Sequence, residues 1–483
     1  MAAKFTPFLS GISVPPPNCC RAFVLSDSLA ERLREILGHA NLLLDPADCW
    51  TYGFDNSRRQ LSPLAVAFPT TSDQIGQLIA TARNNRIALV PRGSGTGTTG
   101  GAVPVENSIV MALERMDSII DIDPGNRTMH VQPGVINDAV QQAAAEHGLF
   151  WAPDPGSSAF CTVGGNLAFN AAGPRAVKYG TTRENVLGLK AITGAGKEIV
   201  TGTNTTKGVV GYDLTRLIIG SEGTLAVITE ATLKLLPLPE SRRTVMASYA
   251  SIDAATRAII SIMTQPVMPC AVEFIDRPAI DMIRDFSDAD LPQHAGALLM
   301  VEVDGAVDCL DSSVQSVSAA LNNDGLLEQR IATTEAESRQ LWATRKALSP
   351  ALRKIAPNKL NEDVVVPVTR IPDLIHGIER LSEQYHLSIV NFGHAGNGNI
   401  HVNLLYDNTD PAQDASARQC LRSLFTLVLE LGGTLSGEHG IGIEKRDYIS
   451  QEIDTASLDL MRKLKTVFDP DNILNPGKIF PSP

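Results

Sequence analysis

Three histidines and a glutamate in the last quarter of the chain have the types and spacing of a metal-dependent catalytic site. His394 and His401 lie seven residues apart around a glycine-rich turn, and Glu438 and His439 form an adjacent pair between two glycines. Two imidazoles and a carboxylate suit zinc, and manganese or ferrous iron are alternatives. A catalytic metal keeps open positions, so three protein ligands suit it better than four.

The adjacent pair is expected to divide its roles. Neighbouring side chains of an extended segment point to opposite sides, so Glu438 and His439 are not expected to enter one ligand set. We predict that His394, His401 and Glu438 bind the metal and that His439 is the catalytic base, since histidine ordinarily titrates near neutrality. The alternatives are a structural role for these histidines and the two-histidine, one-carboxylate site of a non-haem iron oxygenase.

The glycine-rich stretch Pro91–Gly101 is the second chemical feature, and it follows the apolar run Ile87–Val90. Its bare backbone N–H groups and hydroxyls can surround a diphosphate. It contains the pattern G-x-G-x-x-G, but the dinucleotide fingerprint of that form must open a helix. Pro104 and the apolar run Ser108–Leu113 follow instead. We therefore predict a strand–loop–strand phosphate cradle, with a flexible surface loop as the alternative.

Two more stretches of small residues follow before residue 240. One runs from Asp154 to Gly173, and the other, Gly220–Leu225, leads into an apolar strand at 226–229. Small side chains allow the backbone to approach a large flat group, and Asn166 and Asn170 offer hydrogen bonds to a ring edge. Three such stretches in one region favour a large nucleotide cofactor.

Composition excludes several classes of function. The chain has 483 residues and a formal net charge of -12, which argues against nucleic acid or an anionic membrane as the main partner. No apolar run is long enough to span a bilayer. The seven cysteines show neither zinc nor disulfide spacing, which indicates a reducing compartment and hence a cytoplasmic location.

The elements that position these residues are short and alternate between helix and strand. Ser28 is expected to begin a helix through Leu37, and Thr71 to cap another. Residues 119–131 are expected to form a hairpin, and a helix from about Val135 to His147 is expected to stop at Gly148.

The composition changes after Pro239, which suggests a domain boundary. We expect a loose extension at 1–24, a cofactor-binding domain at 25–239, a substrate or cap domain at 240–435, and a C-terminal segment at 436–483.

The order of three motifs carries a family resemblance. RGSGTGTTGG, then DPGSSAFCTVGGNLAFNAAG, then GSEGTLAVITEATLKLLP resembles the FAD domain of the vanillyl-alcohol oxidase/p-cresol methylhydroxylase superfamily. Within it, the chain is most similar to the FAD-linked D-2-hydroxyacid dehydrogenases, which include D-lactate dehydrogenases, the glycolate oxidase flavin subunit and D-2-hydroxyglutarate dehydrogenases. The resemblance implies an α+β fold, with a two-part FAD-binding domain of this type and an α+β cap domain.

The resemblance also implies the cofactor contacts. The Arg92–Gly101 loop is expected to hold the pyrophosphate and residues 153–173 to line the isoalloxazine. The C-terminal segment at 436–483 is expected to return to the FAD domain, with Asn475 near the ring. Many relatives carry a histidine that bonds covalently to FAD, but this chain has none between His39 and His130, so non-covalent FAD is expected. The expected cofactor-binding residues are Arg92, Gly93, Ser94, Gly95, Thr96, Gly97, Pro155, Gly156, Cys161, Thr162, Gly164, Gly165, Asn166, Asn170, Gly173, Glu222, Gly223, Ile228 and Asn475.

For the reaction, the resemblance implies oxidation of a 2-hydroxy acid to the 2-oxo acid, with Arg345 binding the substrate carboxylate. A solvated helix arginine is the alternative for Arg345. Members specific for 2-hydroxyglutarate carry a lysine where this chain has Asn361, so a small D-2-hydroxy acid such as D-lactate, or glycolate, is favoured.

An electron acceptor is also required, and a quinone, a cytochrome and an electron-transfer flavoprotein are candidates. The resemblance permits a flavin subunit that is inactive without iron–sulfur partners. It is equally compatible with a homodimer, and with association with a membrane through the acceptor.

Overall fold

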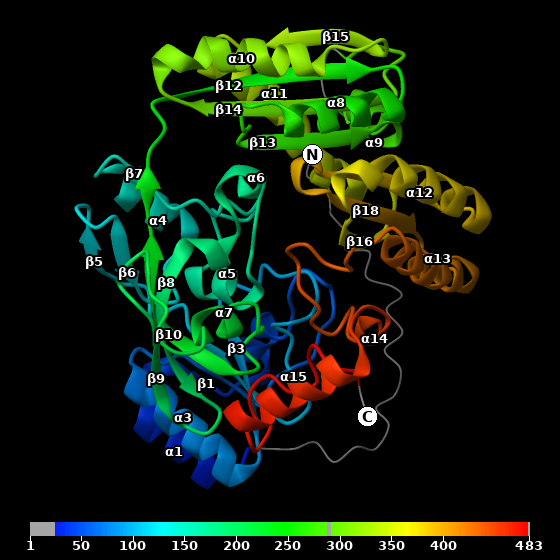
Figure 1. Ribbon diagram of the computed structural model, residues 1–483. Coiled ribbons are helices and arrows are strands. Elements are labelled where there is room, and N and C mark those ends of the chain that lie inside the picture. The colour runs from blue at the N-terminus through cyan, green and yellow to red at the C-terminus, as the bar shows by residue number, and fades with distance from the viewer. Residues whose placement is uncertain (1–24, 287–290, 482–483) are drawn as a thin grey trace, which may run out of the picture.

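A computed structural model describes residues 25–286 and 291–481, so the predicted extension at 1–24 lies outside it. Within these ranges the strands form four sheets. The seven-stranded sheet and its helices occupy the top and right of Figure 1, and the smaller sheets lie below and to the left. No helix in the described ranges is long and apolar enough to cross a membrane.

The first sheet belongs to the N-terminal part of the chain and has the order β1-β2-β4-β3. Only β1 runs antiparallel to its neighbour. Apolar side chains of α1 (Asp27–Leu37) and α3 (Ser72–Asn85) pack with this sheet in one hydrophobic core. Its strands are β1 (Leu42–Leu43), β2 (Ala65–Ala67), β3 (Ala88–Arg92) and β4 (Ser108–Ala112).

The second sheet is antiparallel, with the order β5-β6-β10-β8-β9. Its core includes apolar side chains of α4 (Asn137–Ala145), α5 (Val163–Phe169) and α7 (Leu214–Ile218). Beside it, β7 (Leu149–Phe150) pairs with β11 (Leu236–Pro237). The five strands are β5 (Ile119–Asp123), β6 (Thr128–Val131), β8 (Val186–Thr193), β9 (Glu198–Gly202) and β10 (Ala226–Lys234).

The third large sheet is antiparallel throughout, with the order β15-β12-β14-β13-β17-β18-β16. Its strands are β12 (Ser241–Tyr249), β13 (Ala271–Asp276), β14 (Ala297–Gly305), β15 (Leu326–Ile331), β16 (Asn358–Val365), β17 (Ser388–His394) and β18 (Asn399–Tyr406). Four helices pack on one face: α8 (Ile252–Thr264), α10 (Val307–Leu321), α12 (Ile371–Tyr385) and α13 (Pro411–Glu430). The other face packs against α9 (Arg277–Phe286) and α11 (Glu335–Ile355).

The end of the chain lies against the first sheet. After α14 (Ile449–Glu452) and α15 (Thr455–Phe468), Leu474 forms a parallel bridge with Leu89 of β3. This arrangement agrees with a C-terminal segment that returns to the cofactor-binding part, although the domain boundaries themselves stay a prediction.

Most of the local predictions are confirmed. Thr71 caps α3, residues 119–131 form the β5–β6 hairpin, and the glycine-rich loop joins β3 to β4 without a helix. Two boundaries differ. The first helix is capped by Ser26, whose hydroxyl accepts the Leu29 N–H, and Ser28 lies inside it. The helix predicted from about Val135 to His147 is shorter and ends at Ala145.

Candidate active site

The three predicted metal ligands lie together in the structure. The Nε2 atoms of His394 and His401 are 3.4 Å apart, and Glu438 Oε1 lies 3.6 and 3.5 Å from them. Two ligand atoms held tetrahedrally at zinc's usual distance of about 2.0–2.1 Å stand about 3.3 Å apart. Within the described ranges, this is the only group of three or more histidine, cysteine, aspartate or glutamate side chains with ligand atoms within 4.8 Å of one another.

Sheet geometry explains why the two histidines meet. β17 and β18 are antiparallel neighbours joined by a turn in which Gly398 has φ 74°. A Cβ atom there would stand 1.9 Å from the Val366 carbonyl oxygen, so only glycine fits. His394 ends one strand and His401 lies near the start of the next, on the same face. Burial and the nearby charge of His394 hold the pKa of His401 down at about 3, despite the opposing effect of Glu438. His401 is therefore the neutral imidazole that a metal requires.

Glu273 orients His394 from the neighbouring strand. The two residues are directly paired between β13 and β17, and Glu273 Oε1 contacts His394 Nδ1 at 2.5 Å. Burial alone would lower the pKa of His394, but the charge of Glu273 and this hydrogen bond raise it to about 10. With this raised pKa His394 carries a proton on both ring nitrogens, so a metal that binds Nε2 would displace one proton while Glu273 keeps the other on Nδ1.

Arg345 shares the same carboxylate. Its Nε donates to Glu273 Oε2 at 2.6 Å, and its guanidinium carbon lies 4.7 Å from the centre of the Phe392 ring. Glu273 is completely buried, and burial raises its pKa, but the charges of His394 and Arg345 hold it at about 2. Arg345 is thus a fixed cation at the wall of the cavity described below, which argues against the solvated-arginine alternative.

Asp363 holds the segment that carries Glu438 and His439. Its Oδ2 accepts the backbone N–H groups of Gly437, Glu438 and His439 at 2.9, 2.7 and 2.8 Å, and the buried Lys445 ammonium donates to its Oδ1. Burial opposes the charge, yet His439, Lys445 and these hydrogen bonds hold the pKa of Asp363 well below its usual range. Three successive N–H bonds to one oxygen fix the direction of both side chains.

His439 lies beside the cluster. Its ring stacks on that of His401 with centroids 5.3 Å apart, and its Nδ1 is 3.4 Å from Asp363 Oδ1. Its Nε2 stands 3.9 Å from Glu438 Oε1, farther than the cluster atoms stand from each other. This arrangement agrees with the predicted division of roles, which itself stays a prediction.

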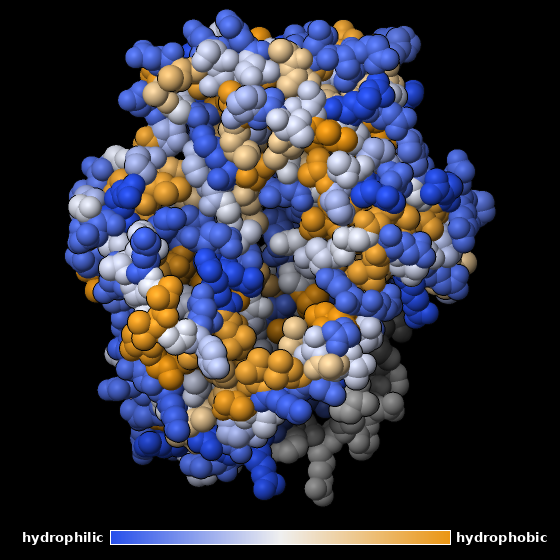
Figure 2. Space-filling model, in the orientation of Figure 1, coloured by the Kyte–Doolittle hydropathy of each residue, from blue (hydrophilic) through white to orange (hydrophobic). Residues whose placement is uncertain are grey.

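A cavity of about 1570 Å³ connects this cluster to the glycine-rich loop. Figure 2 shows the surface hollowed between the upper and lower parts of the molecule. All five predicted catalytic and metal-binding residues line it: Arg345, His394, His401, Glu438 and His439. The predicted cofactor residues that line it are Arg92, Gly93, Ser94, Gly95, Thr96, Gly97, Pro155, Gly156, Thr162, Gly164, Gly165, Asn166, Glu222 and Gly223.

Comparison with known proteins decides the family. Residues 238–479 match the profile of FAD linked oxidases, C-terminal domain, and residues 63–202 match the FAD binding domain. The glycolate oxidase subunit GlcD of Bacillus subtilis (strain 168) is 37% identical over 95% of this chain and 97% of its own length. The chain belongs to the FAD-linked oxidases. It is an oxidoreductase, and FAD is its cofactor.

Other relatives carry different substrate names. A D-2-hydroxyglutarate dehydrogenase of Xanthomonas citri pv. viticola is 32% identical over 94% of this chain and 98% of its own length. A D-lactate dehydrogenase of Archaeoglobus fulgidus is 34% identical over 90% of this chain and 96% of its own. Among solved structures, substrate-bound p-cresol methylhydroxylase matches 94% of this chain and 96% of its own with a TM-score of 0.76 at 18% identity. That likeness shows the fold, which confirms the expected α+β architecture with an FAD-binding domain of this type.

In this FAD-linked oxidase the residues around the cavity fit a large nucleotide. A Cβ atom on Gly93 would stand 2.2 Å from the Thr162 hydroxyl, so glycine lets the loop lie against the start of α5. Thr98 Oγ1 and Asn166 Nδ2 are buried polar atoms with no partner in the described protein, and both side chains line the cavity. Buried polar atoms are normally hydrogen-bonded, so these two atoms are free to bond to a group inside the cavity.

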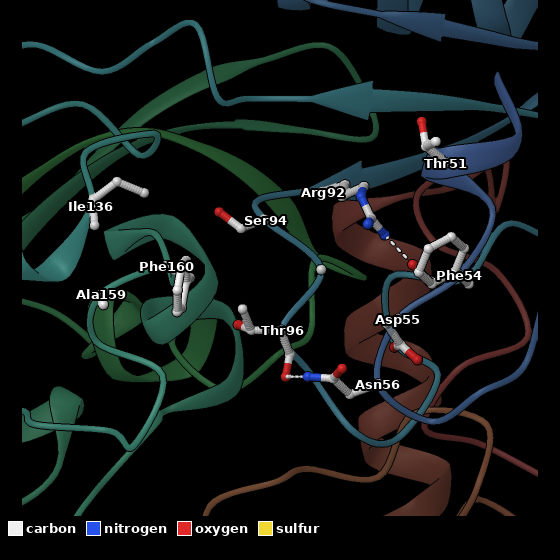
Figure 3. Close-up of a pocket in the computed structure, with 11 residues that line it drawn as sticks. Thr51, Phe54, Asp55, Asn56, Arg92, Ser94, Thr96, Ile136, Ala159 and Phe160 are labelled. Carbon is white, nitrogen blue, oxygen red and sulfur yellow. Dashed lines mark hydrogen bonds between the residues drawn. The ribbon is translucent and has the colours of Figure 1, made fainter. Parts of the chain in front are cut away.

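Figure 3 shows that Arg92 supports the loop with its side chain. Its Nη1 donates to the Phe54 carbonyl oxygen at 2.7 Å, and the residue is only 7% exposed. Asn56 adds a bond from its Nδ2 to the Thr96 carbonyl oxygen at 3.0 Å. Gly95 has φ 69°, and a Cβ atom there would stand 2.1 Å from Arg92 Nη2. The adjoining hollow of about 600 Å³ shares this loop with the main cavity.

Five predicted cofactor residues do not line the cavity: Cys161, Asn170, Gly173, Ile228 and Asn475. Asn170 accepts the Arg183 N–H, and Asn475 donates to the carbonyl oxygens of Gly101 and Glu222. The side chains of Asn170 and Asn475 therefore form hydrogen bonds with the protein backbone.

Sequence reasoning missed the roles of Glu273 and Asp363. Each is a carboxylate within a buried strand, which is unusual unless the charge is paired, and that was the available signal. Their partners lie 121 and 75 residues farther along the chain, so local spacing cannot reveal the pairing.

Proposed function

We propose that this FAD-linked oxidase oxidises a small D-2-hydroxy acid, D-lactate or glycolate, to the 2-oxo acid. One observation carries the proposal: a two-histidine, one-carboxylate cluster, a third imidazole and a fixed arginine open into the cofactor cavity. The names of the relatives, which include a glycolate oxidase subunit and D-lactate dehydrogenases, support the same class of substrate.

The side chains at the site suit such a substrate. Arg345 provides a cation for the carboxylate, and its position is fixed because Glu273 takes its Nε–H. His439 takes the hydroxyl proton. FAD, when bound, accepts the hydride from Cα, while the protein supplies orientation and electrostatics.

The metal proposal rests on His394, His401 and Glu438. Zinc suits two imidazoles and a carboxylate with a free position, and manganese or ferrous iron are alternatives. A bound divalent cation lowers the pKa of a hydroxyl that coordinates it, as it does for water. The non-haem oxygenase alternative leaves the FAD-binding domain and its cavity unexplained.

Electron transfer away from the flavin needs an acceptor, for which a quinone, a cytochrome and an electron-transfer flavoprotein are candidates. The relatives named as glycolate oxidase subunits favour a partner subunit as a second candidate arrangement. Reduction of a dye by the purified chain with D-lactate or glycolate alone would exclude an obligatory partner. A cytoplasmic location and a homodimer also stay predictions.

An anaerobic absorbance spectrum tests the reaction. Addition of D-lactate or glycolate to the purified yellow protein is expected to bleach the oxidised flavin band. A flavin that stays oxidised with every member of a 2-hydroxy acid panel would contradict the proposal.

FAD is expected to be bound without a covalent link. The chain has no histidine between His39 and His130, where many relatives place the linking residue, and threonines occupy the loop. Acid precipitation is therefore expected to leave the yellow colour in the supernatant. Flavin that stays with the denatured pellet would contradict this expectation.

Asn361 is expected to disfavour a substrate with a second carboxylate. Its side chain lines the cavity, and an amide in place of lysine forfeits a charge-assisted hydrogen bond worth about 1.5–3 kcal/mol. D-2-Hydroxyglutarate is therefore not expected to exceed D-lactate in kcat/KM, and Asn361→Lys is expected to favour it. A preference of wild type for D-2-hydroxyglutarate by about tenfold, or 1.4 kcal/mol, would refute this expectation.

Lys359 is the residue that favours the alternative substrate, D-2-hydroxyglutarate. It lies two residues before Asn361 on the same face of β16, lines the same cavity and donates to Asn403 Oδ1 at 3.3 Å. If this ammonium binds a distal carboxylate, Lys359→Met lowers kcat/KM for D-2-hydroxyglutarate and leaves that for glycolate unchanged. Equal effects on both acids would exclude this role.

A further inference from the structure

Glu222 lines the cofactor cavity, and its carboxylate binds the backbone just after Glu438 and His439. The residue lies between α7 and β10, has φ 54° and is 4% exposed. Its Oε1 accepts the Ile441 N–H at 2.7 Å, and its Oε2 accepts the Gly442 N–H at 2.8 Å. Both carboxylate oxygens are thus used on the turn that follows His439.

Thr99 of the glycine-rich loop holds the same turn. Its hydroxyl donates to the His439 carbonyl oxygen at 3.1 Å, and its own carbonyl oxygen accepts the Ile443 N–H at 2.8 Å. Gly442 has φ 53°, and a Cβ atom there would stand 2.1 Å from the Thr99 carbonyl oxygen. The turn therefore lies directly against the cofactor loop.

The two ends of this short segment are anchored to different parts of the fold. Asp363, on the seven-stranded sheet, binds the N–H groups of residues 437–439, and Glu222 binds those of residues 441 and 442. Gly440, at φ 81°, joins the two anchors, and a Cβ atom there would stand 2.8 Å from Glu222 Oε1. Glu438 and His439 are consequently held from both sides.

The Glu222 carboxylate is buried, so its hydrogen bonds matter for stability. Burial raises its pKa to about 7, although the two backbone N–H groups oppose the shift. A buried carboxylate is costly, and it stabilises a structure only where its hydrogen bonds are complete. A glutamine at this position would turn its amide N–H₂ toward one of the two donors.

We propose that Glu222 is a positioning residue for the metal and base site. Together with Thr99, it fixes the turn at 440–443 and so sets the directions of Glu438 and His439. The part of the chain that binds FAD thereby determines the geometry of the metal cluster. The inference rests on the proposed metal at His394, His401 and Glu438.

The test compares Glu222→Gln and Thr99→Val with wild type, each loaded with FAD. The flavin-to-protein ratio of each is measured by absorbance, so that zinc affinity is compared at equal FAD loading. Zinc affinity, measured by competition with a chromophoric chelator, is expected to fall about 10–100-fold in Glu222→Gln, as for loss of other outer partners of metal ligands. Saturating zinc is expected to restore part of the flavin reduction. Thr99→Val is nearly isosteric and keeps the carbonyl contacts, so it is informative if Glu222→Gln does not fold.

Asp469→Asn is the matched control. This buried carboxylate also accepts two backbone N–H groups, those of Ile473 and Leu474 at 3.1 and 2.8 Å, but on the C-terminal return. It is expected to lower the unfolding temperature without changing zinc affinity. The proposal is overturned if the zinc affinity of Glu222→Gln and Thr99→Val equals that of Asp469→Asn, or if Glu222→Gln loses flavin and keeps zinc. A wild-type protein that binds no divalent metal would instead contradict the proposed function.

Discussion

Replacing His439 with alanine is expected to stop rapid flavin reduction while FAD and metal stay bound. The ring lines the cavity and stacks on His401, but its nitrogens lie outside the ligand cluster, so its loss removes a base and no metal ligand. Removal of a general base costs about 10²–10⁴-fold in rate. Anaerobic stopped-flow absorbance with D-lactate or glycolate measures the loss, and metal analysis of the same sample measures the retained metal.

The pH dependence separates a missing base from a disturbed fold. Hydroxide replaces the missing imidazole as pH rises, so the residual rate of His439→Ala is expected to increase at high pH. Glu438→Ala is the comparison, because it removes one of the three converging ligand atoms and is expected to lose metal. The opposite pattern, with metal lost in His439→Ala and kept in Glu438→Ala, would show that the two roles are exchanged.

The local parts of this site could be predicted because their geometry depends on residues that lie close together in the sequence. The two histidines face one another because seven residues suffice for an antiparallel turn, and Gly398 supplies the conformation that the turn needs. The glycine-rich loop was assigned to a strand–loop–strand unit because proline and an apolar run follow it, and β3 and β4 confirm this.

The supporting contacts could not be predicted in the same way. Asp363 reaches the 437–439 segment only after β16 and β18 pair in register, and Glu273 reaches His394 only through the β13–β17 pair. Glu222 lines the cofactor cavity as expected, but the bonds from its carboxylate to the backbone of residues 441 and 442 carry no signal in the local sequence. Such assignments depend on tertiary structure, whereas helix and strand periodicity depends on neighbours in sequence.

The same limit applies to helix ends. Ser26 and Ser28 are both acceptable caps by residue type, and the choice between them depends on backbone conformation. Ser26 has the extended φ and ψ of a capping residue, so the helix is capped two residues before the predicted Ser28. Domain boundaries are harder to predict from the local sequence than helix ends, because the chain crosses between sheets through short segments.

Replacing His394 with alanine is expected to remove the metal, and added metal is expected to restore little. Only two of the three ligand atoms would remain, and Glu273 would lose the imidazole with which it pairs. The loss of metal affinity is expected to exceed the about 10–100-fold typical for an outer partner of a ligand. Metal content after dialysis and flavin reduction by substrate are the two measurements, and His376→Ala, which changes a half-exposed histidine on α12, is the control.

Glu273→Gln completes a graded series with His394→Ala. The glutamine keeps all three ligand atoms but removes the charge that orients His394 and binds Arg345. We expect metal affinity to fall by about 10–100-fold, less than in His394→Ala. Stability is expected to fall as well, because breaking a buried ion pair costs about 3–5 kcal/mol, and denaturant unfolding of the FAD-loaded protein measures that loss. If His394→Ala keeps a full equivalent of metal, the cluster is not the metal site, and the hydroxyl of the substrate must be activated by His439 and Arg345 alone.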